Sequence, residues 1–270
     1  MEIFTGKYNA GDYSMDYCRF GNGPDTFVIL PGISVQSVAA LADAVAEQYR
    51  ILTDDFTVYL FDRRNEIPEH YSVHDMAEDT AEAVKSLGLK DLHIFGASQG
   101  GMIAIDLALS HPELVKKTAV GSTAVRLMPE RFGFFQQLID LCTERDAESL
   151  YLLFGETIFP EPAFEMFRKA YIEAAKTVTD EQMDHFRIIT EGMRDLDMLD
   201  ELAEIKCPLL LIHDKKDKVF PIEFAEEIID RMSGRDDFAY HIYDGYGHIA
   251  YDLAPDYRER LLSFMKVTIQ

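Results

Sequence analysis

The sequence predicts an α/β fold, with a mostly parallel central sheet flanked by helices and an inserted helical cap. From residue 26 onward, short β-rich runs alternate with segments of helical period, which is the pattern of βαβ units. The alternation stops between about residues 125 and 206, where the segments are helical, aromatic and bear methionine. The 270 residues suffice for one large α/β domain with room for an insertion.

The first half of the chain predicts regular elements separated by turn signals. Ser72 is a typical N-cap for an amphipathic helix that Gly88 closes, and Pro112 ends the next helix. In chain order we expect a leading hairpin at 1–19, strands at 26–32, 56–62, 92–96 and 115–123, and helices at 37–49, 72–87 and 100–111.

The second half divides into the cap and a return to the α/β pattern. We predict that residues 1–124 and 207–270 form the core and that residues 125–206 form the cap. After the cap we expect strands at 208–214 and 238–244, a helix at 221–232 and a closing helix that runs through Phe264.

The composition excludes several classes of protein. No apolar run approaches the roughly 18 residues that a membrane-spanning helix needs, so we expect no membrane span. The formal net charge of -22 would repel nucleic-acid phosphates, so we expect no nucleic-acid partner. The same acidity could steer a cationic substrate, although a well-solvated surface is the simpler interpretation.

The cysteines and the first residues bear on the compartment. Cys18, Cys142 and Cys207 are odd in number and far apart, which predicts neither a disulfide framework nor a CxxC site. The first residues have no basic patch followed by an apolar stretch. We therefore expect a cytoplasmic protein, and a homodimer is compatible with the sequence.

The pattern Gly-Ala-Ser-Gln-Gly at residues 96–100 is the central chemical signal. A bare GxSxG is weak, but this one lies between a predicted strand and a predicted helix. A serine on such a strained turn needs small neighbours, and a helix N-terminus favours a developing oxyanion. The pattern predicts Ser98 as a nucleophile; the simpler alternative is a glycine-rich turn with an N-capping serine.

A serine nucleophile requires a histidine base oriented by a carboxylate. His248 lies in a glycine-flanked loop after the last predicted strand, whereas the other histidines fall in strands, at a helix end or in polar stretches. For the acid we favour Asp217 over Asp214, because Asp217 lies farther into its loop and can turn toward His248. Asp244 ranks third, as a turn or cap residue.

These motifs resemble the α/β-hydrolase fold family, in particular its capped, lipase- and esterase-like members. The matching segments are LPGIS, GASQGG, DKKDKVFP and GYGH, in the family's order Ser, Asp, His. The resemblance extends over nearly the whole sequence. The resemblance implies a triad of Ser98, Asp217 and His248. It also implies an oxyanion hole formed by the backbone N–H groups of Ile33 and Gln99.

The chain departs from the family pattern at two positions. Many relatives have His-Gly where this sequence has Pro31 and Gly32, which should change hydrogen bonding around the loop more than it removes the donor. Many also have methionine at the position of Gln99. The Gln99 amide could contact substrate or support the turn, and the sequence leaves both open.

The implied activity is that of a serine hydrolase that cleaves a small carboxylic ester or thioester through an acyl-enzyme on Ser98. It requires no cofactor and no metal. Amidase, carbon-carbon bond hydrolase, acyltransferase and perhydrolase activities use the same triad, and a non-catalytic binding protein of this fold is a further alternative. A serine at the elbow and the lack of tryptophan disfavour dehalogenases and epoxide hydrolases.

Two further patterns have simpler interpretations. His70 and His74, next to Asp75, have the spacing of a metal-binding face, but the Ser72 cap favours a solvated helix start. Aromatic and methionine residues of the cap could line an acyl pocket or pack the cap onto the core; they include Met128, Phe132, Phe135, Phe154 and Phe159.

Overall fold

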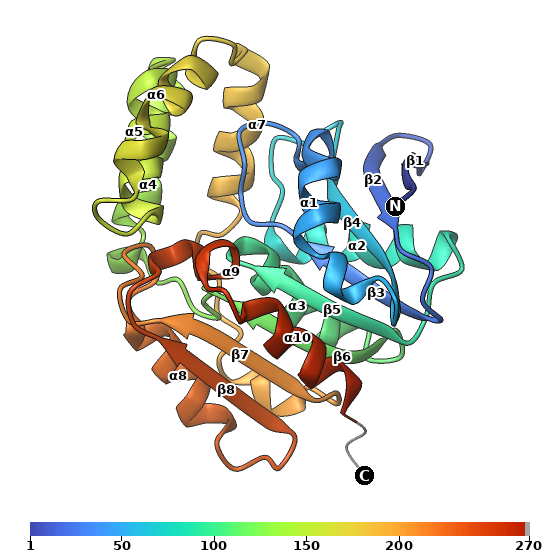
Figure 1. Ribbon diagram of the computed structural model, residues 1–270. Helices are drawn as coiled ribbons and strands as arrows, with labels where there is room; N and C mark the ends of the chain where they lie inside the picture. The colour runs from blue at the N-terminus through green and yellow to red at the C-terminus, as the bar shows by residue number, and fades with distance from the viewer. Residues whose placement is uncertain (268–270) are drawn as a thin grey trace.

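The computed structural model describes residues 1–267, and a sheet of eight strands runs through this part of the chain (Figure 1). The strand order is β1-β2-β4-β3-β5-β6-β7-β8, in which β2 pairs antiparallel with β1 and β4 and the other neighbours are parallel. The strands are β1 Ile3–Asn9, β2 Ser14–Phe20, β3 Asp25–Leu30, β4 Phe56–Arg64, β5 Leu92–Ala97, β6 Val115–Gly121, β7 Leu209–Asp214 and β8 Phe238–Tyr243. The predicted α/β class with a mostly parallel sheet is confirmed.

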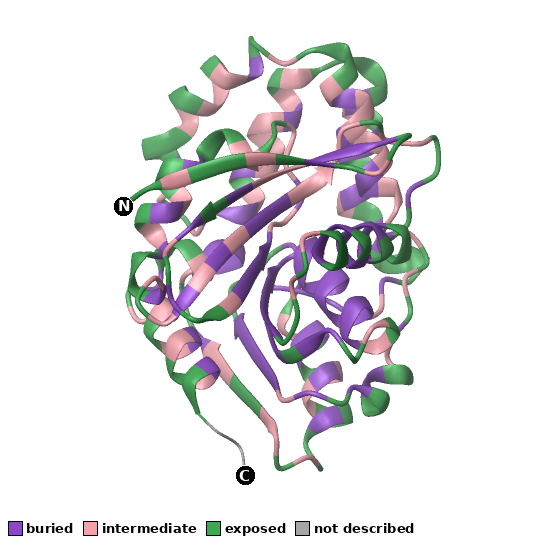
Figure 2. Cartoon of the chain, turned by 90° about the vertical axis from the view of Figure 1, so that its right-hand side faces the viewer, coloured by how far each residue is buried: buried purple, intermediate pink, exposed green. Residues whose placement is uncertain are grey.

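Helices cover both faces of the sheet, which explains the continuous apolar runs of the central strands. Along β7, Leu209 and Leu211 pack into one core cluster, and Leu210 and Ile212 pack into the cluster on the opposite face. Figure 2 shows the buried residues concentrated in the central strands and the helix faces next to them. The helices outside the cap are α1 Ala42–Gln48, α2 Val73–Ser86, α3 Gln99–Ser110, α8 Ile222–Met232, α9 Ala250–Leu253 and α10 Tyr257–Lys266.

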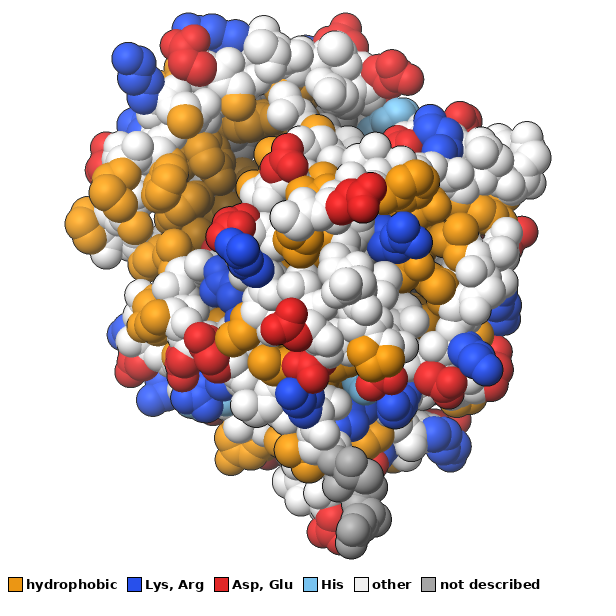
Figure 3. Space-filling model, turned by 45° about the vertical axis from the view of Figure 1, so that its right-hand side comes forward, with side chains coloured by type: hydrophobic (Ala, Val, Ile, Leu, Met, Phe, Trp, Pro, Cys, Tyr) orange, Lys and Arg blue, Asp and Glu red, His pale blue; other side chains and the backbone are white. Residues whose placement is uncertain are grey.

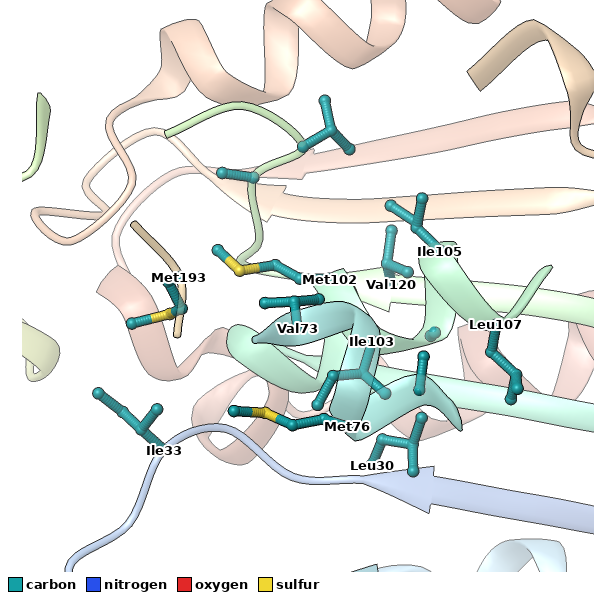
Figure 4. Packing of buried hydrophobic residues seen from close by; sticks show 14 of the residues in the cluster. Leu30, Ile33, Val73, Met76, Met102, Ile103, Ile105, Leu107, Val120 and Met193 are labelled. Carbon is teal, nitrogen blue, oxygen red and sulfur yellow. The ribbon is translucent and has the colours of Figure 1, made fainter. Parts of the chain in front are cut away.

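The larger core cluster forms where α2 and α3 pack on the sheet. Figure 4 shows Met102 and Ile103 of α3 beside Val73 and Met76 of α2, with Leu30 of β3 below them. The predicted cap of α2 is present, because Ser72 Oγ accepts a hydrogen bond from Asp75 N at 3.1 Å. The helix that begins directly after Ser98 is therefore held between the sheet and α2.

Four further helices lie between β6 and β7, in the segment predicted as the cap. They are α4 Gly133–Glu144, α5 Ala147–Ile158, α6 Phe164–Ala175 and α7 Asp180–Glu191. Figure 1 shows them beyond the carboxyl ends of the parallel strands, at the upper left of the molecule. The division of the chain at residues 125 and 206 stays a prediction.

Some element boundaries differ from the sequence-based expectation. The strand predicted to reach residue 32 ends at Leu30, because Pro31 has no N–H to donate to a neighbouring strand. The single closing helix is two helices, α9 and α10, separated by Pro255. As a result, a short helix follows the His248 loop directly.

Candidate active site

Ser98 occupies a sharp turn between β5 and α3. Its backbone dihedrals, φ 55° and ψ −123°, are ones that a residue with a side chain rarely adopts. A Cβ atom on Gly96 would clash with Gly100 O, and one on Gly100 would clash with Leu30 O. The two glycines of the motif therefore permit the close approach of β3, β5 and α3 that creates the turn.

Hydrogen bonds hold the turn in place. Ser98 N donates to Gly121 O at 2.9 Å, and Thr123 Oγ1 donates to Ser98 O at 2.7 Å. Ser98 O also accepts from Gly101 N at 2.9 Å. Because these partners are Gly121 at the end of β6, Thr123 two residues after it and Gly101 in α3, the position of the serine depends on the centre of the sheet.

His248 and Asp217 form a buried pair on the neighbouring loops. His248 Nδ1 lies 2.9 Å from Asp217 Oδ2 and 3.1 Å from Oδ1, and the two residues are 3% and 4% exposed. Asp217 Oδ1 also accepts from the backbone N–H groups of Val219 and Phe220, at 2.8 and 2.9 Å. An ionised carboxylate can only accept, so Nδ1 of a neutral His248 carries the proton and Nε2 is the basic nitrogen.

Asp214, the alternative acid, has a different set of partners. Its carboxylate accepts from Tyr246 N at 2.8 Å, from Gly245 N at 3.0 Å and from Lys216 N at 2.7 Å. It therefore ties the loop after β7 to the loop that carries His248, while Asp217 faces the imidazole. The assignment of the acid to Asp217 rather than Asp214 stays a prediction.

Ser98 and His248 line one cavity of about 370 Å³. Gly32 and Ile33 line the same cavity, beside the turn. The cap contributes Phe154, Ile158, Phe159 and Tyr171 to its wall. Figure 3 shows a hollow lined by hydrophobic side chains on the side where the cap faces the core, at the upper left.

The cap residues named from the sequence divide between the two roles considered for them. Phe154 and Phe159 line the cavity. Phe132 and Phe135 are buried in the core cluster, at 1% and 2% exposure, and Met128 is 38% exposed and does not line the cavity.

Gln99 supports the turn with its side chain. The side chain is fully buried: Oε1 accepts from Arg63 Nη2 at 3.0 Å, and Nε2 donates to Ile189 O at 2.6 Å. Gln99 does not line the cavity, in contrast to Ile33. The amide thus links the serine turn to α7 and to Arg63.

Arg63, near the end of β4, is the residue of this region that the sequence did not single out. Its Nη2 also donates to Pro31 O at 2.8 Å, so one guanidinium holds both the loop before Ile33 and the residue after Ser98. Burial lowers the pKa of this arginine. A charged residue near the carboxyl end of a predicted parallel strand was the available signal.

Of the two histidines considered as metal ligands, His74 has a different partner. His74 Nδ1 lies 3.0 Å from Asp106 Oδ1, and Asp75 caps α2 through Ser72. Among residues 1–267, no group of three or more His, Cys, Asp or Glu side chains is placed to hold a metal ion. In the same part of the chain, no helix is both long enough and apolar enough to cross a bilayer.

The sheet order, the strained serine turn and the helices α4 to α7 inserted between β6 and β7 are together the arrangement of an α/β hydrolase. Residues 25–255 match the family model of the alpha/beta hydrolase fold, and the chain belongs to this family.

Known relatives agree with this assignment. RutD of Serratia proteamaculans is 25% identical over 197 residues, which cover 67% of this chain and 71% of that protein. The mouse serine hydrolase BPHL is 22% identical over 247 residues, 86% of this chain and 77% of that protein. Among solved structures, MGS-M2, an alpha/beta hydrolase enzyme from a Medee basin deep-sea metagenome library, superposes with a TM-score of 0.85 at 19% identity, covering 98% of each chain.

Proposed function

We propose that the protein is a serine hydrolase that cleaves a small carboxylic ester or thioester through an acyl-enzyme on Ser98. One observation carries the proposal: the strained Ser98 and His248 line the same cavity, and the other ring nitrogen of His248 is bound to Asp217 at 2.9 Å. A base held in this tautomer can accept the proton of a serine hydroxyl.

The reaction proceeds in two acyl transfers. Ser98 Oγ attacks the substrate carbonyl carbon as its proton passes to His248 Nε2, and the carbonyl electron pair moves onto oxygen. The intermediate then collapses, the bond to the alcohol or thiol breaks, and the leaving group takes the proton from Nε2. A water molecule repeats both steps on the acyl-enzyme and releases the acid.

Backbone N–H groups stabilise the oxyanion. Gln99 is the first residue of α3, and the first N–H groups of a helix have no partner within the helix. The second donor is the N–H of Ile33, whose residue lines the cavity beside Ser98. Removing one such donor from an acyl-transfer site typically costs about 10²- to 10³-fold in kcat.

The cavity favours a small substrate with an apolar portion. Its volume of about 370 Å³ is at the lower end of ligand pockets, and Phe154, Ile158 and Phe159 give it an apolar wall. Acetyl to hexanoyl esters should therefore be cleaved faster than dodecanoyl esters of the same alcohol.

The test is covalent labelling and turnover in wild type and Ser98→Ala. We expect a fluorophosphonate probe to label wild type alone, and p-nitrophenyl ester turnover to fall by at least about 10⁴-fold in the variant. Ser122→Ala is the matched control, because Ser122 is a buried serine at the end of β6 that does not line the cavity.

Equal labelling or equal turnover of folded wild type and Ser98→Ala would contradict the proposal. A folded wild type that neither reacts with the probe nor cleaves any ester would favour a small-molecule binding protein of this fold.

A further inference from the structure

The cavity that contains Ser98 also contains a carboxylate that the proposed mechanism does not use. Asp252, in the short helix α9, lines the cavity together with Gln48 and Tyr49, which lie at the end of α1. His248 is only four positions before Asp252 in the chain, so the loop that positions the base leads directly to this second acidic group.

Asp252 forms no ion pair within residues 1–267, although the charge of Arg258 acts to lower its pKa. Within residues 1–267, Gln48 Nε2, at 2.5 Å from Oδ1, is the single hydrogen-bond donor to this carboxylate, and no lysine or arginine forms an ion pair with it. Arg258, the nearest candidate, donates to the backbone oxygens of Asp252 and Ala254 at 3.2 and 3.5 Å. The carboxylate is therefore open to a cation from outside the chain.

Asp252 also differs from an ordinary surface carboxylate. Its side chain is accessible to solvent, yet burial raises its pKa above the usual value of aspartate. Accessibility with desolvation is expected where a group faces an enclosed cavity rather than open solvent. Keeping an ionised group in such a place is unfavourable unless it gains a partner.

Three tyrosines complete this part of the cavity. Tyr49, Tyr171 and Tyr251 line it, and the pKa of each is raised, first by burial and then by the negative charge of Asp252. The phenols therefore stay neutral. Aromatic rings around a carboxylate favour an organic cation, which gains from both the charge and the ring quadrupoles.

We propose that Asp252, with Tyr49, Tyr171 and Tyr251, binds a cationic nitrogen of the substrate, so that the preferred substrate is an ester with an ammonium group. This inference rests on the proposed hydrolase function. Asp252 is a specificity-determining residue here and takes no part in the chemistry. The net charge of -22 acts in the same direction, because it attracts cations toward the molecule.

The experiment compares esters that differ in charge and little in shape. One pair is the p-nitrophenyl ester of trimethylammonium-terminated pentanoic acid and its isostere with a tert-butyl group in place of the trimethylammonium. The second pair reverses the orientation: butyrylcholine and its tert-butyl isostere. We expect wild type to prefer the cation in at least one pair by about 10-fold or more in kcat/KM.

Asp252→Asn keeps the shape and an acceptor for Gln48 while removing the charge. We expect this variant to lose about 10-fold of the preference for the cation. Glu47→Gln is the matched control: Glu47 lies beside Gln48 on α1, is 73% exposed at its side chain and does not line the cavity. Its cation preference should equal that of wild type.

A wild type that prefers the neutral ester in both pairs, or an unchanged preference in Asp252→Asn, would overturn the inference while hydrolysis through Ser98 stands. Calorimetric binding of each ester to Ser98→Ala separates the two proposals. If no ester is cleaved, the hydrolase proposal fails, and the ratio of the dissociation constants within each pair still decides whether Asp252 binds the cation.

Discussion

The two ends of the central sheet each bury a histidine, and the two imidazoles differ in their partners. At the carboxyl end, His248 holds Asp217 at 2.9 Å and faces a cavity. At the amino end, His93 is 1% exposed and packs edge-on against Phe56, and its Nδ1 has no hydrogen-bond partner within residues 1–267. Burial and the nearby Lys116 lower the pKa of His93 to about 4. Burial with a nearby cation favours a neutral imidazole, and a carboxylate partner orients the imidazole.

Two cations, the half-buried Arg63 and the buried Lys117, show the same contrast. Arg63 at the carboxyl end bridges Pro31 and Gln99, which belong to two different segments around Ser98. Lys117, in β6, donates from Nζ to the carbonyl oxygens of Phe264, Met265 and Val267, after and within the last turn of α10. Similar groups thus position a site at one end and anchor a helix at the other.

The largest expected effect is on kcat, and it distinguishes Asp217 from Asp214 at the carboxyl end of the sheet. Asp217→Asn should lower kcat for ester hydrolysis by about 10³- to 10⁴-fold, because an amide leaves His248 in the wrong tautomer. Asp214→Asn should instead lower the free energy of unfolding by about 1–3 kcal/mol, since its carboxylate accepts the N–H groups of Gly245 and Tyr246. Steady-state kinetics and urea unfolding of both variants measure the two effects.

Comparable kcat losses in the two variants, with comparable stabilities, would show that Asp217 has no special relation to His248. Rate retained in Asp217→Asn and lost in Asp214→Asn would assign the orienting role to Asp214.

The next prediction compares the substitution of Arg63 with that of Lys117. Arg63→Met and Lys117→Met should each lower the free energy of unfolding by about 1–3 kcal/mol, because each leaves buried oxygens without a donor. Arg63→Met alone should also lower kcat for ester hydrolysis, by about tenfold, since the loop of Ile33 and the turn of Gln99 lose their common tie. Chemical unfolding and steady-state kinetics check this pair.

Equal kcat values in folded Arg63→Met and Lys117→Met would contradict this role of Arg63. Its guanidinium would then stabilise the fold at the carboxyl end of the sheet without positioning the N–H groups of Ile33 and Gln99.

The smallest effect concerns His93 and pH. Since its pKa falls from 6.5 to about 4 on folding, the unfolded chain binds more protons than the native one between these values. The contribution of His93 to the free energy of unfolding is therefore most favourable above pH 6.5. It decreases as the pH falls, by about 1–2 kcal/mol at pH 5. Urea unfolding at several pH values should give His93→Phe a correspondingly weaker decline than wild type, with the carboxylates common to both cancelling in the comparison.

A parallel decline of wild type and His93→Phe over this interval would show that His93 is as easily protonated in the native state as in the unfolded chain.

The fold could be predicted because it follows from local patterns, and local patterns also gave the candidate site residues. Period-two and helical runs predicted the strands and helices, and the glycines at 96 and 100 predicted a turn too crowded for side chains. Asp217 was favoured as the acid because it lies farther beyond its strand than Asp214, and the structure places its carboxylate 2.9 Å from His248 Nδ1.

Contacts between distant segments could not be predicted in this way. Arg63 is 36 positions from Gln99, and Gln99 is 90 positions from Ile189, so no local period connects them. The same holds for Asp252 and Gln48, which lie 204 positions apart. The side chains of α5 and α6 that line the cavity could not be predicted either. Apolar residues recur at helical spacing whether they face the core or a substrate, so the sequence pattern does not distinguish the two.

The bond from Gln99 to Ile189 has a mechanical consequence for the cap. It fastens α7 to the same turn that presents Ser98, so α7 and the nucleophile move as one body while the bond persists. The cavity wall next to this segment comes instead from α5 and α6, through Phe154, Ile158 and Tyr171, so α7 supports the nucleophile turn without lining the cavity.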